Sequence, residues 1–295
     1  MSVEETSRRL AAELAKPRPK KTIEPGLYPR GKVDYDTIAG HNFSTLKHAD
    51  KSLKHYRYRL RNPQAVQSWM AMGTACHTAV LEPDRFMTDY VLFPGKRRAG
   101  KAWDQFVADN DGKQLIKRDE YDKAVAVRDA VRSDSAAGPY FEDGVPEIAM
   151  VWRDEETGLL CRGRTDWLAT GDYLVDLKSS GDVRPMWFGR TGGRLRYHAQ
   201  AAFYSDGYTA ITGREAQVRL IAVEANAPHD VVVFRVLPEQ LDAGRQLYRE
   251  WLTKVADAER TNRWPGVGGG LEHDFQLPVW ELDDENDLDD LGLEN

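Results

Sequence analysis

Three consecutive strand-like runs joined by two short turns are the feature that most limits what this chain can fold into. The runs are EIAMVWRD, GLLCRGRTDWLAT and DYLVDLKSS, separated by Glu-Glu-Thr-Gly and Thr-Gly-Asp. Turns of that composition connect adjacent antiparallel strands. The stretch LRYHAQAAFYSDGYTAI then predicts a helix, and two more strand-like runs follow, AQVRLIAVEA and DVVVFRVL. This order predicts an α/β domain with a mixed sheet.

The first half of the chain is predicted to be helical. Amphipathic stretches lie at about 44–61, 64–81, 99–110 and 118–135, and a last helix is expected from Pro238 to about Asn262. We therefore expect three parts. Residues 1–32 form a basic flexible arm, 33–264 a single domain with helices flanking the sheet, and 265–295 a glycine-rich hinge and an acidic disordered tail.

Charge is segregated along the 295 residues, although the net charge is only −6. Residues 1–64 contain fourteen Lys and Arg against seven Asp and Glu, whereas residues 281–295 contain eight acids and no base. A basic front permits a polyanionic partner, although solvated helices often have the same composition. Two cysteines are too few for a disulfide framework or an iron–sulfur cluster. With no apolar run of membrane length and no secretory-type start, we expect a cytoplasmic protein without a membrane partner.

Two acids and a lysine on neighbouring strands carry the chemistry. Asp176 and Lys178 are two apart on one strand, so their side chains share a face. The short turn at 170–172 brings Asp166 of the preceding strand alongside them. Two carboxylates beside a lysine can hold a hard divalent cation with the ammonium next to its water. The alternative for a lone D-x-K is an ordinary ion pair within a sheet.

Four further residues surround this constellation in the sequence. His77 lies near a helix end, and Glu147 opens the strand that pairs towards Asp166. Gln200 and Tyr204 are one turn apart on a helical face. Each also has a plain structural interpretation, as a core histidine or as part of an amphipathic helix.

Taken together, the motifs resemble the PD-(D/E)XK nuclease superfamily, and within it the RecE-like phage and prophage exonucleases of the exodeoxyribonuclease VIII type. The resemblance spans roughly residues 34–264. The elements that carry it are Gly73-x3-His77 followed by Leu81-Glu82-Pro83, Glu147, the phrase from Gly158 to Asp166, Asp176-Leu177-Lys178 and Gln200-x3-Tyr204. It implies an α/β fold of the PD-(D/E)XK type, a mixed β-sheet flanked by helices.

The resemblance also implies a role for each matching position. The metal ligands would be His77, Asp166, Asp176 and the carbonyl of Leu177, with Glu147 on a second metal. Lys178 would orient the attacking water, Gln200 and Tyr204 would contact the DNA backbone or brace the site, and Arg164 would meet phosphate. Oxygen ligands with one imidazole suit Mg²⁺, with Mn²⁺ as the alternative. From charge alone, the basic helix adds Lys47, Lys51, Lys54 and Arg57 as DNA-binding candidates.

The expected function is a metal-dependent exodeoxyribonuclease that hydrolyses double-stranded DNA from its ends. The family implies 5′→3′ polarity with 3′ overhangs for recombination, a ring-like homo-oligomer, a RecT-like single-strand annealing partner and the cytoplasm of a bacterial host. Two alternatives stay open: a structure-specific or restriction-type endonuclease on the same fold, and a DNA-binding module without catalysis.

Overall fold

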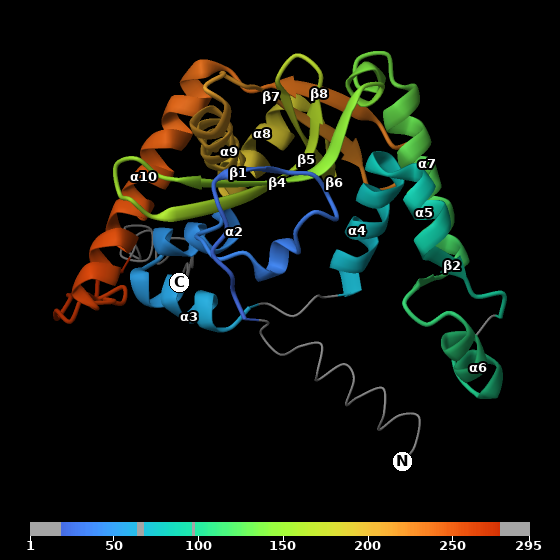
Figure 1. Ribbon diagram of the computed structural model, residues 1–295, viewed down its shortest axis with the longest axis horizontal. Helices are drawn as coiled ribbons and strands as arrows, with labels where there is room; N and C mark the ends of the chain where they lie inside the picture. Colours follow the sequence, from blue (N-terminus) through green and yellow to red (C-terminus); the bar gives the residue numbers. More distant parts are fainter. Residues whose placement is uncertain (1–18, 64–67, 96–97, 278–295) are drawn as a thin grey trace, which may run out of the picture.

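A six-stranded mixed sheet flanked by helices forms the body of the protein (Figure 1). The computed structural model describes residues 19–63, 68–95 and 98–277. The strands are β1 Gly26–Tyr28, β2 Tyr90–Leu92, β3 Gln114–Ile116, β4 Gly144–Arg153, β5 Leu160–Ala169, β6 Tyr173–Ser180, β7 Gln217–Glu224 and β8 Val231–Arg235. The helices are α2 Phe43–Leu46, α3 Leu53–Arg61, α4 Ser68–Leu81, α5 Pro83–Asp89, α6 Lys101–Asp109, α7 Arg118–Ser133, α8 Pro185–Leu195, α9 Tyr197–Thr212 and α10 Pro238–Thr261, with short 3-10 turns η1 Tyr35–Thr37, η2 Lys47–Asp50 and η3 Gly138–Phe141.

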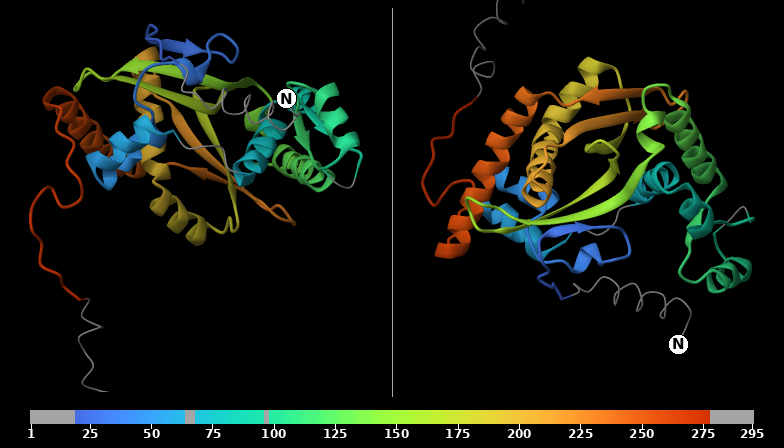
Figure 2. Two further views of the ribbon diagram at one scale, coloured as in Figure 1. Left: turned by 90° about the horizontal axis from the view of Figure 1, so that it is seen from below. Right: turned by 45° about the horizontal axis from the view of Figure 1, so that its top comes forward.

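The strand order confirms the predicted mixed sheet. It runs β1-β4-β5-β6-β7-β8, with every pair antiparallel except β6 and β7, which are parallel. The parallel pair needs a crossover, and α8 and α9 supply it. A separate parallel pair, β2 with β3, lies beside α6 at the periphery of the molecule (Figure 2).

Two cores lie on opposite faces of the sheet. On β6, Leu174 packs in the core beneath α9 and α10, whereas Val175 and Leu177 pack in the core beneath α4 and α7. This alternation follows from the two-residue period of a strand. It places Asp176 and Lys178 on the α9 side, the same side as Leu174.

Two of the predicted helices differ from those in the structure. The helix expected over 44–61 is broken into α2, η2 and α3, because Asn42 caps one segment and Ser52 caps the next, accepting from the amide of His55. The expected single helix before β7 is preceded by a separate helix, α8, which ends where Arg196 adopts a left-handed backbone conformation.

Residues 26–32 are not a free arm. β1 pairs antiparallel with β4, and Tyr28 packs against the small cluster of Ile38, Ala149 and Val151. An arm was expected because this segment is rich in Pro, Lys and Arg. Its three-residue strand instead pairs with the edge of β4, which composition alone could not indicate. Residues 281–295, the predicted acidic tail, lie outside the described residues. No helix within the described ranges is long and apolar enough to cross a bilayer.

Candidate active site

The centre of the site is a fork between β5 and β6. These strands pair only from Trp167↔Val175 to Ala169↔Tyr173, and beyond Trp167 they separate. Cys161 lies in the core beneath α9, whereas Trp167, an even number of residues later, lies in the core beneath α4. β5 therefore changes the face it presents just before the fork, and Asp166 lies at this irregularity. Its Oδ2 accepts the amide N–H of Leu177 at 2.8 Å, which ties the two strands together there.

Lys178 lies at the centre of a set of contacts inside the fork. Its Nζ is 2.5 Å from Oδ2 of Asp176 and donates to Oε1 of Gln200 at 3.2 Å. The ammonium also lies 4.7 Å from the centre of the Tyr197 ring, within range of a cation–π interaction. Burial alone would lower the pKa of Lys178, but the carboxylates of Asp176 and Asp166 outweigh it and raise the pKa. The lysine is therefore held as a cation.

Asp166 is in an environment that opposes its charge. Burial is the main cause and the neighbouring carboxylate of Asp176 the next, and together they raise the pKa of Asp166 well above its usual value. Lys178 and the Leu177 amide offset only part of this effect. The fork therefore has an excess of negative charge that an added cation would neutralise.

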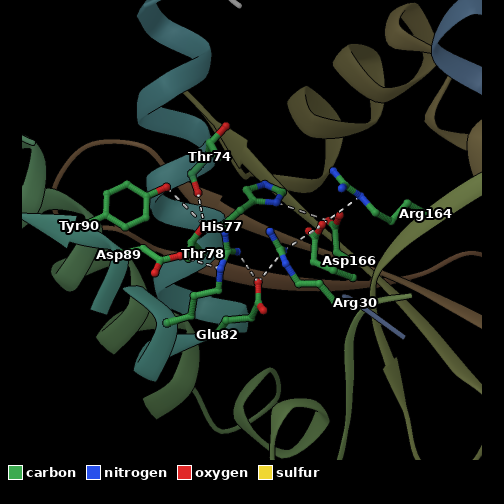
Figure 3. A network of polar contacts seen from close by, with 11 residues as sticks. Arg30, Thr74, His77, Thr78, Glu82, Asp89, Tyr90, Arg164 and Asp166 are labelled. Atoms are coloured by element: carbon green, nitrogen blue, oxygen red, sulfur yellow. Dashed lines mark hydrogen bonds and ion pairs between the residues drawn. The ribbon is translucent and has the colours of Figure 1, made fainter. Parts of the chain in front are cut away.

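His77 approaches the fork from α4. Its Nδ1 lies 3.7 Å from Oδ2 of Asp166 (Figure 3). Burial, and then the charge of Lys178, lower the pKa of His77 to about 4. At neutral pH the ring is uncharged, which is the form in which imidazole binds a metal.

Glu147 lies on β4 across from Asp166 and is held by two arginines. Its Oε2 is 2.9 Å from Nε of Arg164 and 3.4 Å from a guanidinium nitrogen of Arg30. Its backbone φ is +52°, the left-handed region that non-glycine residues rarely adopt. The register of β4 and β5 has a gap there, because Pro146 pairs with Trp167 and Ile148 with Thr165. Such local strain is typical of functional sites.

A cavity of about 610 Å³ opens beside these residues, between α4 and the sheet. His77, Glu147 and Asp166 line it, together with four arginines: Arg30, Arg85, Arg98 and Arg164. The space is large enough for a nucleotide-sized group, and its arginines present donors for phosphate oxygens.

The donor set fits a divalent metal by type and position. Asp166, Asp176 and neutral His77 meet at the fork, and the excess negative charge there is what a cation would compensate. Within the described residues, however, no three His, Cys, Asp or Glu side chains form a ready-made metal cluster. Asp176 is paired with Lys178, and Glu147 with arginines, so these carboxylates would have to reorient to bind a metal.

Gln200 and Tyr204 extend the same network from α9. Gln200 accepts from Lys178, and the Tyr204 hydroxyl is hydrogen-bonded to Gln200. The Tyr204 ring packs over Gly163 of β5, where an added Cβ would come within 2.8 Å of the ring. Gly163 is thus needed for this approach, a role that the sequence reasoning missed although the residue stands inside the motif phrase.

The basic residues predicted to bind DNA, in η2, α3 and the turn between them, do not all lie near the fork. Burial is the main cause that lowers the pKa of Lys47, and the charge of nearby Lys178 is the next. Lys51 is exposed. Lys54 and Arg57 instead face the segment after α10: the Lys54 amide donates to the carbonyl of Pro265, and Arg57 stacks on Trp264. Lys47 is therefore the basic candidate placed at the fork.

Two further residues of the site were given no role by the sequence reasoning. Arg30 comes from the segment predicted to be an arm, and its guanidinium is 2.6 Å from Oε2 of Glu82 as well as close to Glu147 (Figure 3). Glu82 also binds Arg85 at 2.9 Å. The conspicuous Leu-Glu-Pro sequence was a signal for Glu82, but nothing local indicated Arg30.

Comparison with known proteins agrees with this architecture. A family model described as a PDDEXK-like domain of unknown function (DUF3799) matches residues 42–273. No curated protein matches the sequence. Among solved structures, a crystal structure of a "putative exonuclease" from Eubacterium rectale superposes with a TM-score of 0.55. That match covers 82% of this chain and 92% of the other at 14% identity, so it supports the fold alone.

Proposed function

This chain belongs to the PDDEXK-like domain family, and from that premise we propose that it is a metal-dependent exodeoxyribonuclease acting on the ends of double-stranded DNA. The observation that carries the proposal is the fork. Asp166, Asp176 and Lys178 meet where β5 and β6 separate, and Asp166 also lines the arginine-rich cavity.

Hydrolysis of a phosphodiester requires positive charge, because the anionic centre repels an incoming hydroxide. A bound Mg²⁺ or Mn²⁺ would supply that charge and lower the pKa of a bound water. The residues that would hold it are Asp166, Asp176, His77 and the carbonyl of Leu177, with Glu147 as the ligand of a second ion.

The protein's own cations have separate roles. Lys178, kept protonated by Asp176 and Asp166 and oriented by Gln200, stabilises the charge that develops on the scissile phosphate. Tyr204 holds Gln200 in place. The arginines of the cavity bind phosphates of the strand being cut.

The finer properties of the proposal rest on the resemblance to RecE-like enzymes. They are 5′→3′ polarity, a 3′ single-stranded product, a ring-like homo-oligomer and an annealing protein of the RecT type as partner. Arg164 and Lys47 are the proposed DNA contacts nearest the fork, because Arg164 lines the cavity and Lys47 lies near Lys178.

The test is a time course on linear duplex DNA labelled at either the 5′ or the 3′ end, with Mg²⁺ or with EDTA. We expect mononucleotide release from the 5′ label with Mg²⁺ and none with EDTA. Asp176→Ala should abolish release, whereas Asp257→Asn, which changes an exposed acid of α10, should leave it unchanged.

A covalently closed circle should remain intact in the same assay. Cutting of the circle at a comparable rate would instead identify an endonuclease. Wild-type activity of the Asp176→Ala variant with Mg²⁺ would contradict the proposed site altogether.

A further inference from the structure

Helix α8 exposes an unusual surface next to the catalytic strand. The segment from Arg184 to His198 contains four arginines and no acid. Met186 and Trp187 are large apolar side chains, yet they are 66% and 45% exposed. Adjacent exposed apolar side chains rimmed by polar residues are typical of interaction sites.

Two arginines lie against the exposed ring of Trp187. The guanidinium carbons of Arg184 and Arg190 lie 5.6 and 5.0 Å from the ring centre. Arg184 is paired with Asp182, but within the described residues neither Arg190 nor Arg194 has a carboxylate partner. Trp187, Arg190 and Arg194 recur at helical spacing, so they form one exposed stripe.

Two glycines inside α8 are not explained by packing. Gly189 and Gly193 lie inside α8 with nothing within 4 Å of an added Cβ, so packing does not require them. Each glycine weakens the helix relative to alanine. They line a cavity of about 350 Å³ whose walls include the rings of Phe188, Tyr197 and Phe234.

The surface is connected to the catalytic lysine through two rings. Phe188, on the inner side of α8, lies 5.9 Å from Tyr197 between ring centres, and Tyr197 lies 4.7 Å from the Lys178 ammonium. Helix α8 is therefore separated from Lys178 by only two side chains, Phe188 and Tyr197.

We propose that the exposed face of α8, formed by Arg184, Met186, Trp187, Arg190 and Arg194, binds unpaired single-stranded DNA by stacking its bases on Trp187. Exposed aromatic rings flanked by arginines are how single strands are held without sequence preference. The absence of acids from the segment favours a polyanion over a protein partner. The inference deepens the proposed nuclease and rests on it in part, since such an enzyme leaves one strand unpaired.

The test measures binding in EDTA, so it does not depend on hydrolysis. The probe is a fluorescent thymidine oligonucleotide of roughly 15 nucleotides, compared with a blunt duplex of equal length. We expect Trp187→Leu to weaken oligonucleotide binding about ten-fold and to affect the duplex less. Trp187→Phe, which keeps a flat ring, should bind within about three-fold of the wild type.

Salt dependence tests the arginines separately. Replacing Arg190 and Arg194 with alanine should reduce the slope of log affinity against log salt by about 0.7 for each phosphate that the protein no longer neutralises. Arg118→Ala, which removes an exposed arginine from α7, should leave the slope unchanged. Circular dichroism confirms that each variant is folded.

Three results would overturn the proposal. One is wild-type oligonucleotide affinity in Trp187→Leu, and another is an unchanged salt slope in the double arginine variant. The third is altered self-association of Trp187→Leu with unchanged DNA binding, which would identify a protein interface. If the wild type binds through Trp187 but hydrolyses nothing with Mg²⁺, the nuclease proposal fails while this one stands.

Discussion

Asp166 is a buried carboxylate whose charge the folded protein accommodates poorly. Its pKa is raised by burial and by Asp176, so above that pKa the ionised form costs stability relative to the unfolded chain. We predict that Asp166→Asn is more stable than the wild type at pH 7.5 in EDTA, by about 1 kcal/mol or more. The asparagine Oδ1 can still accept the Leu177 amide.

Thermal unfolding with and without Mg²⁺ checks this prediction. The wild type should gain stability from the metal, because the ion binds only the folded state. Asp166→Asn should gain much less, although it starts from a higher melting temperature. A variant less stable than the wild type in EDTA would show that the carboxylate is not strained.

At the scale of single residues, the sequence predicted that Asp166, Asp176 and Lys178 converge, because the period of a strand is local. Asp176 and Lys178 share a face for that reason alone, and a tight turn returns Asp166 beside them. Arg30 could not be predicted in the same way, because its contacts with Glu82 and Glu147 join segments more than fifty residues apart. Only the packing of β1 on β4 brings them together.

At the scale of elements, the strands were predicted better than the helices. β4, β5 and β6 have clear turns between them, whereas the separate helix α8 was missed because its three glycines weaken the helical pattern. The break between α2 and α3 depends on Ser52, which caps the start of α3. The sequence pattern instead placed Ser52 inside one continuous amphipathic helix.

Gly244 of α10 gives a prediction at the element scale. An added Cβ would lie inside van der Waals contact with the backbone of His198 and Ala199 on α9. Helix propensity alone predicts that Gly244→Ala stabilises the protein by about 1 kcal/mol. We expect the reverse, a loss of about 1–3 kcal/mol, because the two helices must separate.

Urea unfolding of a matched pair tests this expectation. Gly193→Ala is the control, since Gly193 is also inside a helix but has open space at its Cβ. It should be neutral or stabilising. Equal stabilisation of both variants would mean that α9 and α10 are not in close backbone contact.

At the scale of the whole molecule, four histidines favour the same direction of pH dependence. Burial lowers the pKa of His41, His48, His77 and His198. The unfolded chain therefore binds more protons as pH falls below about 6.5, and the folded state loses stability. Asp166 acts in the opposite sense, because its raised pKa makes the folded state bind a proton first.

We predict that the free energy of unfolding of the metal-free protein decreases from pH 7.5 to pH 5. We expect the four histidines together to outweigh the single aspartate in this range. His198→Gln, a residue outside the fork, should flatten the curve measured by urea unfolding. A wild-type curve that rises as pH falls would show that Asp166 dominates.

The last prediction concerns whether the N-terminal segment, residues 19–32, is part of the folded domain. Composition alone marks residues 1–32 as a basic flexible arm, but β1 covers the edge of β4 and Arg30 holds Glu82 and Glu147 at the cavity. We predict that deleting residues 1–32 lowers the free energy of unfolding by about 2–4 kcal/mol, since it exposes the cluster around Ile38 and Val151. Protein lacking only residues 1–18 keeps β1 and Arg30, so the difference between the two truncations isolates residues 19–32.

The variant Arg30→Ala in the full chain separates the contribution of the Arg30 side chain from that of strand β1. It should lose little stability, because its ion pairs are partly exposed, but it should weaken binding of duplex ends at low salt. Equal stability of the two truncations would mean that β1 does not belong to the folded domain.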